Sequence, residues 1–175
     1  MNWPTRWRTW SRLSRLLIAD SGPLIALAKL RLLDLPAAIY PAVWVPAAVL
    51  HECTRTGVFP DAMAIEAALS AGWLHACEDA PADGHPALLR LDAGERAAIS
   101  LALQQERADL LIDEAAGRQA ARAVGLRVIG ACGLLLRGKA MGRLSSVGPL
   151  IDELRRQGYF VSPALRAEVL RLAGE

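Results

Sequence analysis

The sequence predicts a three-layer α/β/α domain with a central, mainly parallel sheet, and three observations lead to this prediction. Short apolar runs alternate with segments of helical periodicity along the chain, which is typical of strand–helix units. The run LLIAD at residues 16–20 is typical of a buried strand. With 53% hydrophobic and 22% charged residues, the 175-residue chain can form one globular domain with a sizeable core.

The first half of the predicted domain contains two units in which a strand leads directly into a helix. The expected elements are a strand at 16–20, a helix at 21–30, a strand at 42–46, a helix at 46–55, a polar turn at 57–61, a helix at 62–72 and a short edge strand at 73–78. Pro23 lies in the first turn of one helix and Pro46 begins the next, where the missing proline N–H costs nothing. Gly72 is placed to end the third helix.

The second half continues the alternation of strands and helices. The expected elements are a loop at 81–87, a helix at 91–106, a strand at 108–113, a helix at 114–125, a strand at 126–130, a helix at 131–142 and two helices around 157–162. Gly125 closes one of these helices. No repeat and no long linker divides the series, so residues 16–175 are expected to form a single domain.

Residues 1–15 are expected to form a basic, Trp/Arg-rich N-terminal extension. They contain four arginines, no acidic residue and three of the five tryptophans. The net charge of +2 therefore hides a slightly acidic domain. Interleaved arginines and tryptophans suit phosphates and stacked bases, and a loosely packed extension without a binding role is the alternative.

The composition argues against several classes of protein. Charged residues interrupt the most apolar region, so no run reaches the roughly 20 residues of a membrane span, and no export signal is evident. The three cysteines lack a CxxC pair and the three histidines form no ligand pattern, which disfavours a disulfide framework and a zinc site. These features indicate a soluble protein of the reducing cytoplasm.

Two aspartates occupy equivalent positions in the predicted sheet. Asp20 and Asp113 each end an apolar strand and immediately precede a helix. Because the carboxyl ends of parallel strands share the edge at which such folds bind ligands, the two side chains are expected to lie close together. Helix N-capping is the structural alternative for each.

Two glutamates are further candidates for the same edge. Glu95 follows Asp92 at the spacing of a capping box, which needs no function. Glu52 lies beside Cys53 and leans towards the apolar side of its helix, although a surface glutamate fits the pattern as well. Converging carboxylates without counter-charges would bind a hard cation, and oxygen ligands favour Mg²⁺ or Mn²⁺ over zinc. Two such ions about 4 Å apart would promote phosphodiester hydrolysis.

Five segments together resemble the PIN-domain family of metal-dependent ribonucleases, which includes bacterial toxins of the VapC type. The segments are IADSGPLIALAKL (18–30), VPAAVLHE (45–52), LDAGERAAISLAL (91–103), LLIDEAAGRQAARAVGLRVIG (110–130) and GLLLRGKAMG (133–142). They cover most of residues 16–160 in the family's order, and a PIN-like branch of predicted nucleic-acid-binding proteins is the most similar. The resemblance implies a parallel sheet with helices on both faces and RNA as the substrate.

The resemblance also implies roles for individual residues. The implied catalytic residues and ligands of Mg²⁺ or Mn²⁺ are Asp20, Glu52, Glu95 and Asp113, with Glu114 as a further metal ligand. Ser21 would support a metal-bound water, and Arg118 would contact a substrate phosphate. An i, i+4 ion pair with Glu114 is the alternative for Arg118. The third acid is Glu95, where the toxins more often carry aspartate.

A metal-dependent endoribonuclease is therefore the predicted function, with the toxin of a toxin–antitoxin pair as a specific case. A small antitoxin would then insert a basic side chain among the acids, and the domain would form a homodimer. The alternative is a PIN fold that binds RNA or a protein without nuclease activity. Phosphotransfer on Asp20 is disfavoured because position 22 is glycine, and GLLLRGKA at 133–140 is no phosphate-binding loop because it ends in alanine.

Overall fold

The central sheet of the protein has five strands, all of them parallel. The structure, a computed structural model, describes residues 15–54, 60–81 and 85–175. In these residues the sheet order is β3-β2-β1-β4-β5. The strands are β1 (Leu16–Ala19), β2 (Val43–Pro46), β3 (His75–Cys77), β4 (Ala108–Leu111) and β5 (Arg127–Ile129). The predicted parallel sheet, with 73–78 at its edge, is confirmed.

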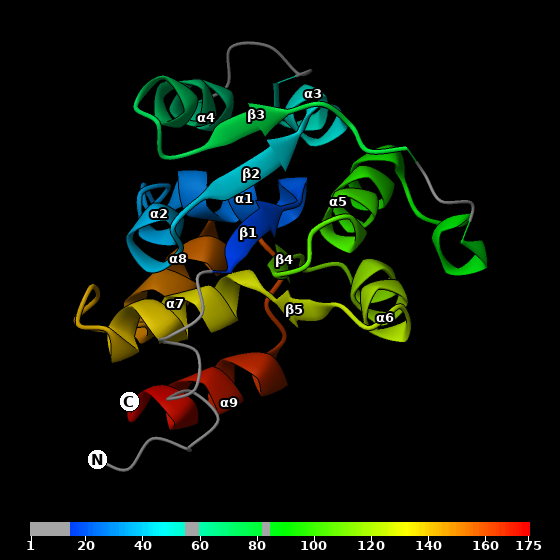
Figure 1. Cartoon of the computed structure of the whole chain (residues 1–175). Coiled ribbons are helices and arrows are strands. Elements are labelled where there is room, and N and C mark those ends of the chain that lie inside the picture. The colour runs from blue at the N-terminus through cyan, green and yellow to red at the C-terminus, as the bar shows by residue number, and fades with distance from the viewer. Residues whose placement is uncertain (1–14, 55–59, 82–84) are drawn as a thin grey trace.

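Helices cover both faces of the sheet and complete the predicted three-layer α/β/α arrangement (Figure 1). They are α1 (Ser21–Lys29), α2 (Leu35–Ile39), α3 (Ala47–Thr54), α4 (Pro60–Ser70), α5 (Ala93–Leu103), α6 (Ala115–Ala123), α7 (Ala131–Ala140), α8 (Gly148–Arg156) and α9 (Pro163–Ala173), with a 3₁₀ helix, η2, at Pro86–Leu88. The central strands are enclosed, so Leu17, Ile18 and Leu110 have no exposed surface. None of the helices within the described ranges is long and apolar enough to cross a membrane.

The strand order reverses between β1 and β4. From β1 the chain proceeds through β2 to β3 on one side, and it then places β4 and β5 on the other side. The backbone N–H of Asp20 donates to the carbonyl of Leu111 at 2.9 Å, so the residue after β1 is fixed beside the last residue of β4. In open α/β sheets the crevice at such a reversal is where ligands bind.

Two predicted boundaries around prolines are wrong. Pro46 is the last residue of β2, and α3 begins one residue later. Proline has no N–H to donate, and its ring is tolerated at the last position of this strand as well as at a helix start. Pro60 and Asp61 begin α4 and do not belong to a turn, which is the usual position for proline in a helix. The remainder of that predicted turn, 57–59, lies outside the described residues.

Two short helices are additions to the predicted elements. α2 has five residues, too few for a helical period to show in the sequence. In the predicted loop at 81–87, Pro86 begins η2, and the side chain of His85 accepts the N–H of Ala87 at its start. Residues 82–84 of this loop lie outside the described part of the chain.

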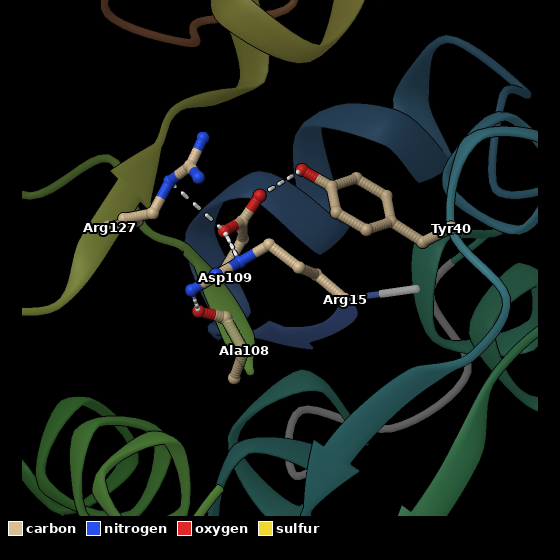
Figure 2. Close-up of polar contacts among 5 residues, drawn as sticks. All are labelled: Arg15, Tyr40, Ala108, Asp109 and Arg127. Carbon is tan, nitrogen blue, oxygen red and sulfur yellow. Dashed lines mark hydrogen bonds and ion pairs between the residues drawn. The ribbon is translucent and has the colours of Figure 1, made fainter. Parts of the chain in front are cut away.

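One buried charge stabilises the opposite end of the sheet, where the strands begin (Figure 2). Asp109, in β4, is 1% exposed. Its Oδ1 accepts a hydrogen bond from Nε of Arg15 at 2.7 Å and lies 3.5 Å from Nε of Arg127. Its Oδ2 accepts from the hydroxyl of Tyr40 at 3.1 Å. The Asp109 cluster, formed by these four residues, thus joins the residue before β1 to β4, β5 and the residue after α2.

Candidate functional site

Asp20 lies at the β1–β4 crevice with its carboxylate buried. It occupies the N-cap position of α1, but its side chain makes no capping hydrogen bond. Asp20 is 4% exposed, and its Oδ1 has no hydrogen-bond partner among the described residues. Burial raises the pKa of Asp20 to about 7, and the backbone N–H of Ser21 acts in the opposite direction. Because a buried polar atom without a partner is costly, this oxygen is suited to a ligand.

Glu95 stabilises its helix and faces the same crevice. The predicted capping box of α5 is confirmed: Asp92 Oδ1 accepts the N–H of Glu95 at 2.8 Å, and Glu95 Oε2 accepts the N–H of Asp92 at 3.3 Å. The second oxygen of Glu95, Oε1, is buried and has no partner in the described part of the chain. It lies against Gly117 of α6, where a Cβ would be only 2.6 Å away. Capping therefore uses one oxygen of Glu95 and leaves the other available.

Glu52 projects from α3 towards the start of α5. It is half-buried, and its Oε1 accepts the backbone N–H of Gly94 at 2.9 Å. After burial, the contributions that raise the pKa of Asp20 are the negative charges of Asp92, Glu95 and Glu52. We refer to these four carboxylates as the acidic group. Three of the four acids predicted to be catalytic, Asp20, Glu52 and Glu95, thus lie close enough to influence one another electrostatically, and Asp92 joins them.

Asp113 lies at the same sheet edge but is directed towards other partners. It lies two residues beyond the end of β4, not within the strand as predicted. Its carboxylate accepts the N–H of Ala131 at 3.1 and 3.2 Å and also accepts the hydroxyl of Tyr159. Asp113 therefore binds the first N–H of α7, not the start of α6, the helix that follows it in sequence. Burial raises the pKa of Asp113, and the hydrogen bonds from Tyr159 and Ala131 oppose this shift.

The other three predicted residues surround these acids. Glu114 is exposed at the N-cap position of α6, and its charge is among those that, after burial, raise the pKa of Glu95. Ser21 is half-buried as the first residue of α1. Arg118 donates to the carbonyl of Ile112 at 2.8 Å, and no ion pair joins it to Glu114 within the described ranges. The ion-pair alternative for Arg118 is therefore not supported, and its contact with phosphate stays a prediction.

The donor atoms of this site suit a hard divalent cation. Every candidate ligand is a carboxylate oxygen, which Mg²⁺ and Mn²⁺ prefer. Among the residues that the structure describes, no three His, Cys, Asp or Glu side chains form a group that could hold a metal ion by themselves. Mg²⁺, however, usually retains several waters and takes one or two protein carboxylates besides substrate phosphates. The unpartnered oxygens of Asp20 and Glu95 fit that requirement.

Three glycines and a tyrosine belong to the site although the sequence does not single them out. A Cβ at each glycine would lie 2.4 Å (Gly94), 2.6 Å (Gly117) or 2.4 Å (Gly130) from a carboxylate oxygen of Glu52, Glu95 or Asp113, respectively. Glycine inside a helix is unfavourable by about 1 kcal/mol relative to alanine. The occurrence of Gly94 and Gly117 within predicted helices is therefore the feature of the sequence that could have indicated a close contact at these positions. Tyr159 has no signal, because it meets Asp113 across 46 positions of sequence.

Comparison with known proteins identifies one family. A family model described as a PIN domain matches residues 16–175. The match spans β1 to α9, and so includes the sheet, its flanking helices and every acid of the candidate site. Comparisons with curated proteins and with solved structures found no match to the chain.

Proposed function

The chain belongs to the PIN-domain family, and from this premise we propose that it is a metal-dependent endoribonuclease that hydrolyses RNA phosphodiesters. PIN domains are generally nucleases that use divalent metal ions. The observation that supports the proposal best is the pair of buried, unpartnered carboxylate oxygens of Asp20 and Glu95 at the β1–β4 crevice. Neither atom accepts a hydrogen bond from the described residues, whereas a divalent cation would use both.

The proposed roles follow from the surroundings of each side chain. A bound Mg²⁺ or Mn²⁺ would lower the pKa of a water molecule and neutralise charge on the phosphodiester. Asp20 and Glu95 would hold this ion through the oxygens that have no other partner. Glu52 and Asp113, whose carboxylates are oriented by backbone N–H groups, would complete the ligand set, and Glu114, exposed at the entrance of α6, would serve a second ion.

Substrate contacts are proposed for two residues beside the acids. Arg118 is the cation placed next to Asp113, since the carbonyl that it binds belongs to the preceding residue, Ile112. Its guanidinium group can donate further hydrogen bonds to a phosphate. Ser21 follows Asp20 directly, and its hydroxyl would orient a water molecule or a phosphate oxygen at the start of α1.

The proposal includes the toxin of a toxin–antitoxin pair as a specific case. A small antitoxin would then insert a lysine or arginine into the acidic group, because a cationic side chain relieves the mutual repulsion of these carboxylates. The toxin case also includes a homodimer. The proposed location is the cytoplasm, where RNA is the abundant phosphodiester and where the three free cysteines would stay reduced.

The direct experiment is cleavage of a mixed pool of single-stranded RNA by the purified full chain. We expect cleavage with Mg²⁺ or Mn²⁺, and loss of cleavage after addition of a chelator. Asp20→Asn should abolish cleavage, because it removes the charge while nearly keeping the shape. A protein that cuts no RNA in the pool and shows no Mn²⁺ binding by calorimetry would contradict the proposal.

Asp34→Asn is a matched control for that variant. Asp34 also occupies an N-cap position, that of α2, and also makes no capping hydrogen bond there. Unlike Asp20, it is exposed and lies outside the acidic group. Asp34→Asn should therefore cleave RNA as the wild type does. Cleavage by the Asp20→Asn preparation at the same rate as by Asp34→Asn would reveal a contaminating nuclease.

A PIN fold that binds RNA or protein without cutting is the second candidate, and one observation favours it. Both oxygens of Asp113 already accept hydrogen bonds from the protein, so this acid is less available to a metal than Asp20. RNA binding by Asp20→Asn and by a chain that lacks residues 1–14, and so keeps the contact of Arg15 with Asp109, separates the two functions. If only the truncation abolishes binding and no preparation cleaves, the protein is a binding module.

A further inference from the structure

Tyr159 contacts an acid of the candidate site from a distant part of the chain. It lies in the connection between α8 and α9, immediately after Gly158, whose φ of +80° is favourable only for glycine. Its backbone N–H donates to the carbonyl of Leu154 at 2.9 Å, which fixes the turn at the end of α8. The half-buried side chain then reaches Asp113 and donates its hydroxyl to Oδ2.

The orientation of the Asp113 carboxylate depends on such contacts. The residue lies two positions beyond β4, so the pairing of the sheet does not set the direction of its side chain. The N–H of Ala131 contacts both oxygens at nearly equal distances, 3.1 and 3.2 Å. The hydroxyl of Tyr159 contacts Oδ2 only, and it is therefore the contact that distinguishes one oxygen from the other.

Tyr159 also lies within electrostatic range of the second strand-end aspartate, Asp20. Burial raises the pKa of Tyr159, and the negative charges of Asp113 and Asp20 add to the shift. The phenol thus contacts Asp113 directly and is influenced by the charge of Asp20, the aspartate on the other side of the β1–β4 crevice. The crevice has no other described tyrosine, since the only other one in the chain is Tyr40 in the Asp109 cluster.

We propose that Tyr159 is a positioning residue for the reaction: its hydroxyl holds the Asp113 carboxylate in the orientation in which this acid helps to bind the divalent cation. The inference rests on the proposed function and names a residue that the acidic residues alone do not reveal. Groups that hydrogen-bond to metal-binding side chains orient them, and their loss typically weakens metal binding or activity by about 10-fold to 100-fold.

The chain contains a matched control at the other end of the same strand. Tyr40 donates its hydroxyl to Oδ2 of Asp109 at 3.1 Å, in the cluster shown in Figure 2. Tyr40→Phe and Tyr159→Phe therefore remove the same atom from the same kind of contact, tyrosine to aspartate, at opposite ends of β4. Only Tyr159→Phe removes it at the edge where the acidic group lies.

The first measurement is the affinity for Mn²⁺ by calorimetry, without RNA. We expect Tyr159→Phe to bind Mn²⁺ at least about 10-fold more weakly than the wild type, and Tyr40→Phe to bind it equally well. In RNA cleavage, Tyr159→Phe should lower kcat while KM for RNA stays within about twofold, because the substrate contacts are intact. Thermal unfolding of both variants reports any purely structural loss.

The second measurement uses the wild-type sequence and does not depend on the folding of a variant. Incorporation of fluorotyrosine gives two ¹⁹F resonances, one for each tyrosine of the chain, and Tyr40→Phe identifies them. Paramagnetic Mn²⁺ should broaden the Tyr159 resonance and leave the Tyr40 resonance sharp. Equal broadening of both resonances, or of neither, would overturn the inference.

The outcomes separate this inference from the proposed function. If Tyr159→Phe binds Mn²⁺ as tightly as the wild type and both cleave RNA, the proposed function stands and the role of Tyr159 is refuted. A lower Tm with unchanged Mn²⁺ affinity refutes it in the same way, since the contact is then only structural. If the wild type neither binds Mn²⁺ nor cleaves RNA, the proposed function itself fails, and the inference fails with it.

Discussion

Gly94 donates its backbone N–H to Oε1 of Glu52 at 2.9 Å, and a methyl group at position 94 would lie 2.4 Å from Oε2 of the same carboxylate. The start of α5 and the end of α3 can approach this closely only because residue 94 has no side chain. The glycine therefore determines where the Glu52 carboxylate lies relative to Asp20 and Glu95.

Gly94→Ala should lower activity without lowering stability. The new methyl group must displace the Glu52 carboxylate from the acidic group, so we expect RNA cleavage to fall by about 10-fold, as for loss of an orienting contact. Alanine is favoured over glycine in helices by up to about 1 kcal/mol, so Tm should be unchanged or higher. Cleavage assays and thermal unfolding measure the two effects.

Gly22→Ala is the control for this substitution. Gly22 is the second residue of α1, as Gly94 is the second residue of α5, and a Cβ at Gly22 meets no atom within 4 Å. This variant gains the same helix preference without displacing a carboxylate, so it should keep full activity. Equal activity of the two variants would show that the position of Glu52 is unimportant.

Substitutions of Glu95 should separate its structural role from its proposed catalytic role. Glu95→Gln keeps a side-chain oxygen for the N–H of Asp92, and glutamine is accepted in a capping box. We expect Tm to change little and cleavage to be lost, because the charge at the unpartnered oxygen is removed. Glu95→Ala should lose cleavage and, in addition, about 1 kcal/mol of unfolding free energy. An active Glu95→Gln variant would mean that the residue serves only the helix.

The stability of the metal-free protein should depend on pH through Asp20. Its pKa is raised from 3.8 to about 7, so between these values the folded protein binds this proton more tightly than the unfolded chain does. The folded state is accordingly disfavoured as the pH rises through this interval, and the full effect is present above pH about 7. The shift corresponds to destabilisation on the order of 4 kcal/mol.

Asp20→Asn removes this titration and tests its sign. In the presence of a chelator, the variant should raise the free energy of unfolding at pH about 8 and should have little effect at pH about 4. Mg²⁺ should stabilise the wild type at pH about 8 and should not stabilise the variant. Urea unfolding at the two pH values measures the difference, and an equal effect of the substitution at both would contradict the raised pKa.

The fold could be predicted from the sequence because its strands are short buried runs joined by helices with clear ends. The position of Asp20 between a strand and a helix, and the capping box of Asp92 and Glu95, could be predicted for a similar reason, since each depends only on residues that are close in sequence. The placement of Asp20 and Asp113 after neighbouring strands, at the same end of the sheet, followed from a general property of parallel sheets. The sequence did not reveal that Asp113 binds the first N–H of α7, because that helix begins 18 positions later.

Contacts between distant segments account for the rest of what was not predicted. Tyr159 contacts Asp113 from the connection between α8 and α9, and no local sequence pattern predicts such a contact. Asp109 is a charged residue in an otherwise apolar strand, and the sequence does not show what offsets the cost of its burial. The structure shows that Arg15 and Tyr40 donate hydrogen bonds to its carboxylate. Buried polar residues in strands are accordingly informative only after their partners are known.

Asp109 should be important for stability and unimportant for the proposed reaction. Asp109→Asn leaves Arg15 and Arg127 without the charge that they share, at a site where the aspartate is 1% exposed. Because the arginines are partly exposed, we expect the loss to be about 2 kcal/mol, below the 3–5 kcal/mol typical of a fully buried pair. The Asp109 cluster lies at the opposite ends of the strands from the acidic group, so Mn²⁺ affinity and cleavage per folded molecule should be unchanged.

Asp152→Asn is a control, since Asp152 accepts two hydrogen bonds from Arg166 at 2.7 and 2.8 Å but its side chain is 45% exposed; ion pairs so open to solvent contribute little. Urea unfolding of both variants measures the contrast. Similar losses in the two would show that burial does not strengthen the Asp109 cluster, and a fall in Mn²⁺ affinity with Asp109→Asn would show that the two ends of β4 are coupled.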